Sequence, residues 1–263
     1  MVNGKKMKWI LVITGLVLAL WAVGLLPVAG QSNKEPDRKL IALSGKLLLQ
    51  VKMDEPVDSL RKALAMMITD SLISGLADDD ARKTFWINIY NAYFQILATK
   101  EKKTRPAIFK EKLITIGGVK LSLDQIEHGI LRRYRAKLSL GYLPQFFPGK
   151  TIKQLAVSKI DYRIHFALNC GATSCPPIAF YDYGKIDKQL SIAASSFLKT
   201  DTQINPQKKT VMVSRILQWF KADFGGNNGI KIILKKYLGE DFSEYSLKFK
   251  EYDWTQKMKN FDS

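Results

Sequence analysis

The sequence predicts an α+β domain in which helices pack on a mostly antiparallel sheet. Helical apolar spacing dominates the first hundred residues of the folded part, strand-like segments are scattered after it, and strands and helices do not alternate regularly. No internal repeat or low-complexity linker is present. We therefore expect residues 40–263 to form a single domain, which residues 31–39 precede as a polar tether.

Helices are expected first along the chain. Apolar residues recur at helical period over residues 40–51 and 57–76. A third helix is expected over residues 81–100, because the three aspartates at 78–80 place negative charge at the positive end of its dipole.

A tight β-hairpin is expected over residues 113–121, because two apolar segments flank a central Gly-Gly pair. Ser122 and Gln125 then have the spacing of a capping box, which starts a helix that ends near Arg133. Residues 136–150 contain two glycines and two prolines and are expected to form a loop.

The remainder of the chain predicts a mixture of strands and helices. Alternating apolar residues predict a strand over residues 162–168, on which Arg163, His165 and Asn169 share one face. The further elements that we expect are a helix over 186–198, a strand over 210–213, a helix over 215–220 with Ser214 as its cap, a turn over 225–229, a last helix to Leu238, and a closing strand over 247–254.

The N-terminal segment predicts export. Three lysines precede an almost continuous apolar run over residues 9–29, and residues 28–30 (Val-Ala-Gly) resemble a signal-peptidase site. We interpret residues 1–30 as a signal peptide. The apolar run is also long enough to span a bilayer, so an uncleaved membrane anchor over residues 9–29 is the alternative. Both interpretations place the domain in the periplasm or cell envelope.

The net charge of +17 predicts anionic partners. Three lysines and no acids precede Gln31, so the rest of the chain carries +14. Outside the cytoplasm the candidates are phospholipid head groups, anionic polysaccharide and acidic peptides. Because the lysines are spread along the chain, we expect an unidentified peptide or anionic envelope ligand and no nucleic acid.

One very apolar helix contains two amides three residues apart, Asn88 and Asn91, on a single helical face. Asparagine is a poor helix former, and a buried amide without a partner costs about 1–3 kcal/mol. The amides either fix the shape of a neighbouring loop or help a site by orienting a catalytic histidine or binding substrate. We regard both as candidate substrate-binding residues.

Glu127 and His128 are adjacent on a helix, so their side chains diverge by about 100°. One is then expected to face the core or a cleft and the other to face away. A buried glutamate is a candidate acid or base, and His128 is a candidate binding residue. The alternative is that Glu127 is solvated or pairs with Arg132 or Arg133.

The segment 163–177 contains one of the two histidines and both cysteines. His165 is a candidate catalytic residue, with Arg163 and Asn169 as candidate binding residues on the same strand face. No cofactor or metal is assigned to the site.

Cys170 and Cys175 are the remaining catalytic candidates. In an exported chain a close cysteine pair most simply forms a disulfide. The sequence leaves open a thiolate nucleophile assisted by His165, and zinc ligation that includes His128. The thiolate alternative requires a bend near Asn169, because an unbroken strand turns His165 and Cys170 to opposite faces.

Four segments, 85–92, 126–132, 163–177 and 252–254, together resemble family 547 of the domains of unknown function, over about residues 80–254. This family is distantly similar to the papain/transglutaminase-like superfamily, which implies helices packed on an antiparallel sheet. In papain-like enzymes the nucleophilic cysteine begins a core helix. The corresponding helix of this chain contains no cysteine, so the resemblance does not imply a thiol-protease mechanism.

Two function hypotheses follow. The first is a hydrolase or acyl transferase acting on peptide or amide bonds in the cell envelope, with a cleft around Asn91, Glu127, His165 and the cysteine loop. The second is a non-catalytic envelope domain whose polar cluster is structural or recognises a peptide or anionic ligand. A metal-dependent hydrolase is a third.

Overall fold

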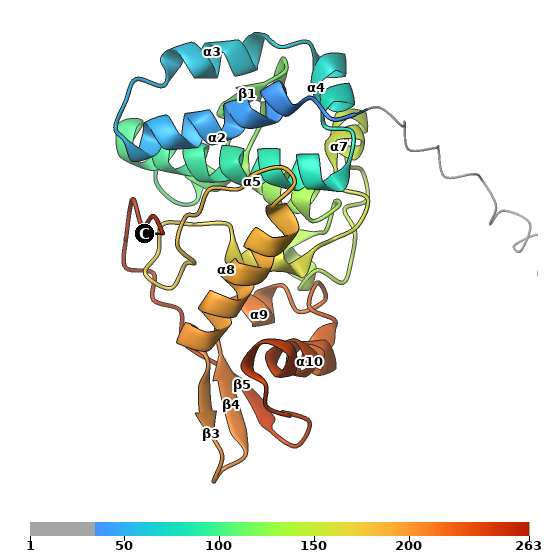
Figure 1. Ribbon diagram of the computed structural model, residues 1–263, viewed down its shortest axis with the longest axis vertical. Coiled ribbons are helices and arrows are strands. Elements are labelled where there is room, and N and C mark those ends of the chain that lie inside the picture. Colours follow the sequence, from blue (N-terminus) through green and yellow to red (C-terminus); the bar gives the residue numbers. More distant parts are fainter. Residues whose placement is uncertain (1–34, 263) are drawn as a thin grey trace, which may run out of the picture. The chain divides into compact units, whose positions relative to one another are not determined.

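The computed structural model describes residues 35–262, which belong to one compact unit. The expected single α+β domain is confirmed, because helices predominate and the strands form two small, mostly antiparallel sheets (Figure 1). The signal segment or anchor expected over residues 1–30 lies outside the described residues. No helix within residues 35–262 is long and apolar enough to cross a membrane.

Four helices gather at one end of the domain (Figure 1). They are α2 (Arg38–Lys52), α3 (Asp58–Met66), α4 (Thr69–Gly75) and α5 (Asp79–Gln95), and α5 continues into a π-helical turn, η1 (Ile96–Lys100). The predicted helix 57–76 is divided, because Gly117 of the hairpin turn bonds to the chain on both sides of the break. Its N–H donates to the Leu64 carbonyl (2.8 Å), and its carbonyl accepts from the Thr69 hydroxyl (2.6 Å).

Helix α5 is the central element of the core. It begins just after Asp78, where the acidic run predicted a helix start, and the Asp78 side chain caps it by accepting a hydrogen bond from the Ala81 N–H at 2.7 Å. Every residue from 83 to 95 is buried. Its polar side chains must therefore find partners inside the protein.

The predicted hairpin and capping box are confirmed. Strands β1 (Ile114–Ile116) and β2 (Val119–Leu121) pair antiparallel around the Gly-Gly turn, after the short helix α6 (Ala107–Lys110). The Ser122 hydroxyl accepts from the Gln125 N–H, and the Gln125 side chain accepts from the Ser122 N–H, each at 3.1 Å. The helix that follows, η2 (Gln125–Leu131), has π-helical hydrogen bonding.

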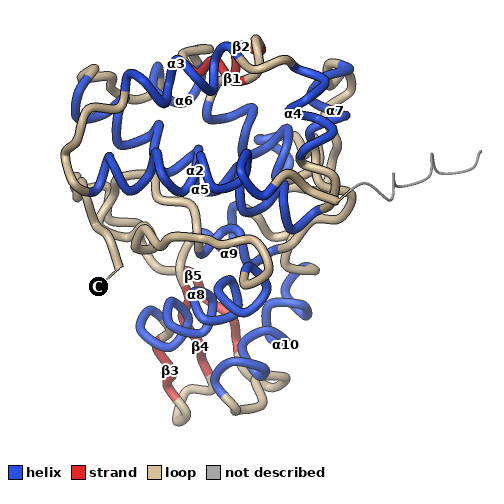
Figure 2. Tube along the Cα trace, turned by 45° about the horizontal axis from the view of Figure 1, so that its top comes forward, coloured by secondary structure: helices blue, strands red, loops and turns tan. Residues whose placement is uncertain are grey.

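The second sheet lies at the opposite end from α2–α5, beside α8 and α10, in two views (Figures 1 and 2). Its strand order is β3–β4–β5, with β3–β4 antiparallel and β4–β5 parallel. The remaining elements, in chain order, are η3 (Lys137–Ser139), α7 (Lys150–Leu155), η4 (Tyr162–Phe166), α8 (Ile186–Asp201), β3 (Gln203–Asn205), β4 (Thr210–Val213), α9 (Ile216–Trp219), α10 (Gly226–Leu238) and β5 (Ser246–Phe249). Elements α7 and β3 were not predicted, β5 ends before residue 254, and the expected turn at 225–229 is largely the first turn of α10.

The strand predicted over residues 162–168 is wrong, because η4 is a 3₁₀ helix. The Asp161 side chain caps it by accepting from the Arg163 N–H (3.1 Å), and the Ala167 N–H donates to the Ile164 carbonyl (2.9 Å). The 3₁₀ turns of η4 bury Ile164 and Phe166, the same apolar residues that the predicted strand would bury. Arg163 and His165 therefore do not share a strand face.

Candidate functional site

A cavity of about 500 Å³ opens where α5, η2, η4, α9 and the cysteine loop meet. Its acid–base side chains come from η2 and its N-terminal flank, and from η4. They are Asp124, Glu127, His128 and His165. Its aromatic walls are Tyr90, Phe109, Trp219, Phe220, Tyr252 and Trp254. Glu127 and His165 therefore share one cavity.

His165 is oriented by a carboxylate that comes from a distant part of the sequence. Its Nε2 lies 2.9 Å from Oδ2 of Asp223, and its ring stacks on Phe220 with centroids 3.9 Å apart. Burial raises the pKa of Asp223, but hydrogen bonds from His165 and Arg132 outweigh this effect and hold the pKa below its usual value. The ionised carboxylate only accepts hydrogen bonds, so Nε2 of His165 carries the proton.

The other nitrogen of this ring, Nδ1, makes no hydrogen bond to residues 35–262. Burial lowers the pKa of His165, while the hydrogen bond and charge of Asp223 partly oppose that effect. The imidazole is therefore neutral at pH 7. It lines the cavity with an unprotonated nitrogen, which is the state that a general base requires.

Asp223 also joins the two histidines of the chain through Arg132. Arg132 Nε lies 2.6 Å from Asp223 Oδ2 and Nη2 lies 3.2 Å from Oδ1, and both side chains are almost fully buried. Arg132 Nη1 lies 2.9 Å from Nδ1 of His128. Because arginine only donates, His128 accepts at Nδ1 and carries its proton on Nε2. We call His165, Asp223, Arg132 and His128 the histidine chain.

His128 is also neutral. Burial lowers its pKa to about 3, and the positive charge of Arg132 adds to the effect. The expectation that one of Glu127 and His128 faces away is wrong, because both line the cavity from the π-helical η2. Glu127 accepts a hydrogen bond from the Tyr90 hydroxyl at 3.3 Å, and Arg132, one of the partners named in the alternative interpretation, binds Asp223 instead.

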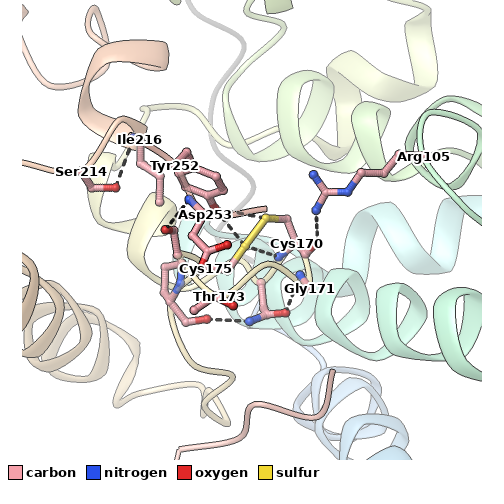
Figure 3. Close-up of a disulfide and its surroundings, with 12 residues drawn as sticks. Arg105, Cys170, Gly171, Thr173, Cys175, Ser214, Ile216, Tyr252 and Asp253 are labelled. Carbon is pink, nitrogen blue, oxygen red and sulfur yellow. Dashed lines mark hydrogen bonds between the residues drawn. A yellow bond between two sulfur atoms is a disulfide. The ribbon is translucent and has the colours of Figure 1, made fainter. Parts of the chain in front are cut away.

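Cys170 and Cys175 form a disulfide that lies in the cavity wall (Figure 3). The chain reverses at Gly171, which has φ +73°. In the bonded state neither sulfur is a thiolate nucleophile or a thiolate zinc ligand. Among residues 35–262 no group of three His, Cys, Asp or Glu side chains is placed to hold a metal ion.

The disulfide is held by two side chains of the cavity (Figure 3). The Tyr252 hydroxyl lies 3.3 Å from Sγ of Cys170 and 3.1 Å from Sγ of Cys175. Arg105 donates from Nη2 to the Cys170 carbonyl at 2.6 Å, and its guanidinium lies 4.2 Å above the Trp254 ring. Arg105 has no ion-pair partner in the described part of the chain, so most of its donors remain available to a ligand.

The buried asparagines form the frame beneath this loop. Asn91 donates to the Ala167 carbonyl and accepts from the Asn169 N–H, both at 2.9 Å. Asn169 donates to the Pro176 carbonyl at 2.7 Å and accepts from the Gly171 N–H at 2.9 Å. These bonds fix the shape of the cysteine loop.

Asn88 has the same kind of role in another loop, because its amide bonds both the N–H and the carbonyl of Tyr181. None of the three asparagines lines the cavity, so their assignment as substrate-binding residues is corrected to a structural role. Arg163 is corrected in the same way. It bonds Asp161 and Asp187 outside the cavity, and its hydrogen bond to Asp161 raises its pKa.

Four residues that the site uses were not found by sequence reasoning, namely Arg105, Arg132 as a buried partner, Asp223 and Tyr252. Asp223 lies 58 positions after His165 and between two aromatic segments that give no sign of a carboxylate partner. The one local signal was the Tyr-Asp-Trp run at 252–254, which was noted as part of the resemblance and not as part of a site.

The family model described as "Protein of unknown function, DUF547" matches residues 73–198. The chain contains a DUF547 domain. The matched residues of the DUF547 domain include α5, η2, η4 and the cysteine loop, whereas Asp223 and Tyr252 lie outside them. No curated protein and no solved structure matches the chain. The similarity to papain-like enzymes thus stays an expectation.

Proposed function

We propose that the protein is an exported hydrolase that cleaves a peptide or amide bond in the cell envelope. The observation that carries the proposal is His165, a neutral imidazole that a buried carboxylate orients at 2.9 Å and whose second nitrogen is unpaired in a cavity. Carboxylate–histidine pairs of this kind orient a general base and stabilise its protonated form.

Water is the nucleophile in this proposal. Among the described residues that line the cavity there is no serine, threonine or free thiol. Nδ1 of His165 takes a proton from water as the water oxygen attacks the carbonyl carbon. The same proton then passes to the nitrogen of the leaving amine as the C–N bond breaks. Asp223 remains ionised and stabilises the intermediate imidazolium.

The cavity also contains two charged groups that can bind a substrate, one a hydrogen-bond donor and the other an acceptor. Arg105 offers unpaired N–H donors to a carbonyl or carboxylate oxygen, and Glu127 offers a carboxylate that Tyr90 orients. The aromatic walls supply apolar contact to the rest of the ligand. Arg105 and Glu127 together suit a peptide, because an amide offers a carbonyl oxygen to the guanidinium and an N–H to the carboxylate.

The experiment compares the full-length protein with His165→Gln and Asp223→Asn on isolated cell envelopes. Hydrolysis of an amide releases a new amine, which is labelled with a mass tag and identified. We expect both variants to lose at least about 100-fold in the rate of release, which is the lower end for removal of a general base. Asp241→Asn, which changes an exposed carboxylate outside the cavity, serves as the control and keeps the wild-type rate.

Release of the same amines by wild type and by His165→Gln at equal rates would overturn the proposal. Circular dichroism melts of each variant separate a lost base from a lost fold. If no His165-dependent amine is released, the hydrolase proposal is rejected in favour of the second function below.

The second function is recognition without catalysis, and the bonded cysteines favour it. The disulfide, Tyr252 and Arg105 form a rigid wall with exposed donors, which is typical of a binding site for a peptide or anionic ligand. In that case Arg105→Gln weakens ligand capture from the envelope fraction, while His165→Gln leaves it unchanged.

A further inference from the structure

A loop at the mouth of the cavity exposes much apolar surface. We call residues 136–149 the rim loop. Leu138 and Phe147 are 97% and 98% exposed and Phe146 is 86% exposed, and Leu138 also lines the cavity. Apolar side chains that gather on a protein surface mark an interaction site.

Backbone hydrogen bonds hold the rim loop in a defined shape. The Ala136 N–H donates to the Leu143 carbonyl (2.8 Å), and the Gln145 N–H donates to the Tyr134 carbonyl (2.6 Å). The Ser139 hydroxyl accepts from the Leu143 N–H at 3.0 Å. The apolar tips therefore project from an ordered frame and do not depend on local unfolding for their exposure.

The chain on both sides of the rim loop carries only positive charge. Between Glu127 and Asp161 there are seven lysines and arginines and no acidic residue. Two of the seven are ion-paired, Arg132 with Asp223 and Lys137 with Asp124. The other five have no ion-pair partner within residues 35–262, and the four of them nearest the rim loop are Arg133, Arg135, Lys150 and Lys153.

The rim loop also packs on the histidine chain. The Leu140 carbonyl accepts from the Ala222 N–H at 3.0 Å. Gly141 has φ +86°, and a Cβ on it would come within 2.7 Å of both Arg132 Nη2 and Asp223 Oδ1. Any surface that contacts the rim loop is thus directly adjacent to the cavity.

We propose that the rim loop docks the protein on a bilayer that contains anionic phospholipid. Leu138, Phe146 and Phe147 enter the boundary between head groups and acyl chains, as apolar residues flanked by basic ones do. The flanking lysines and arginines contact the lipid phosphates. Docking in this way turns the mouth of the cavity towards the membrane surface, and it is independent of the reaction proposed above.

The experiment places an environment-sensitive dye on the rim loop of the full-length protein. Phe147→Cys is labelled with a nitrobenzoxadiazole dye, and Ile68→Cys, at a position 71% exposed on a different segment, is the matched control. The native cysteines are bonded to each other, so the new thiol is the labelling target. Any attachment through the N-terminal segment is common to both proteins, so a difference between the two positions reports on the loop.

With vesicles of phosphatidylglycerol and phosphatidylcholine we expect a blue shift and a severalfold rise in emission at position 147, and no change at 68. Replacing Arg133, Arg135, Lys150 and Lys153 by Gln should weaken vesicle binding by roughly fivefold for each residue. An unchanged signal at 147, or an equal response to phosphatidylcholine alone, overturns the proposal. A response that requires added envelope protein also overturns it and assigns the loop to a protein partner.

Discussion

The two polar clusters of this domain, both buried, differ in how completely their hydrogen bonds are used. Beneath the cysteine loop, Asn91 and Asn169 bond backbone groups at both ends of their amides. In the histidine chain, the bonds run from His128 through Arg132 and Asp223 to His165 and end at an unpaired nitrogen in the cavity. Fully paired polar groups fix a structure, whereas a pre-oriented group that lacks a partner at a cavity is available for chemistry.

The largest expected effect is on the histidine chain. Arg132→Met leaves the buried Asp223 carboxylate without its cationic partner and with only the His165 hydrogen bond, so we expect the free energy of unfolding to fall by about 3–5 kcal/mol. Urea denaturation at pH 7 measures this loss. Lys235→Met breaks an exposed ion pair with Asp241 and should change the free energy of unfolding little. Equal losses in the two variants would show that the buried Arg132–Asp223 pair stabilises the fold no more than an exposed ion pair does.

Acid should destabilise the protein through His128. Its pKa is about 3 when folded and 6.5 when unfolded, so between these values the unfolded chain binds the proton first. The stability that neutral His128 contributes is present above pH 6.5 and is lost as the pH falls towards 3. In His128→Asn, we expect the loss of unfolding free energy from pH 7 to pH 4 to be smaller by about 2–3 kcal/mol. Identical pH dependence in both proteins would contradict a buried, neutral His128.

Mutation of the buried asparagines beneath the cysteine loop should change the stability of the protein and nothing else. Asn91→Leu removes the partners of the Ala167 carbonyl and the Asn169 N–H and should lower the free energy of unfolding by on the order of 1–3 kcal/mol. Asn227→Leu, at an exposed position, is the control and should change the denaturation midpoint little. An unchanged midpoint for Asn91→Leu would mean that its amide is poised for a ligand and not for the loop.

The same contrast explains how much could be predicted from sequence. The hairpin turn, the capping box and the acidic start of α5 depend on residues within four positions of one another, so their signals are local and were found. Asp223 pairs with residues 58 and 91 positions away, and no local pattern encodes such a contact.

The error at residues 162–168 has a different cause. A short alternation of apolar residues fits a strand, but it also fits a 3₁₀ turn once Asp161 caps the segment. The cavity was expected around Asn91, Glu127, His165 and the cysteines. In the structure Glu127, His165 and the cysteines line the cavity. Asn91 lies beneath the cysteine loop instead, because its amide bonds the backbone of that loop's first residues.

The smallest expected effect is spectroscopic and concerns the end of the histidine chain. The protein has only two histidines, so ¹⁵N NMR of the imidazole nitrogens resolves both, and His128→Asn assigns them. We expect His165 to be the Nε2–H tautomer and to titrate below pH 6.5. Because the hydrogen bond and charge of Asp223 raise the pKa of His165, Asp223→Asn should lower that pKa further, while Asn91→Leu should leave the tautomer unchanged. A protonated Nδ1 in the wild-type protein, or a higher pKa in Asp223→Asn, would remove the base from the cavity and would leave the histidine chain as structural as the amides.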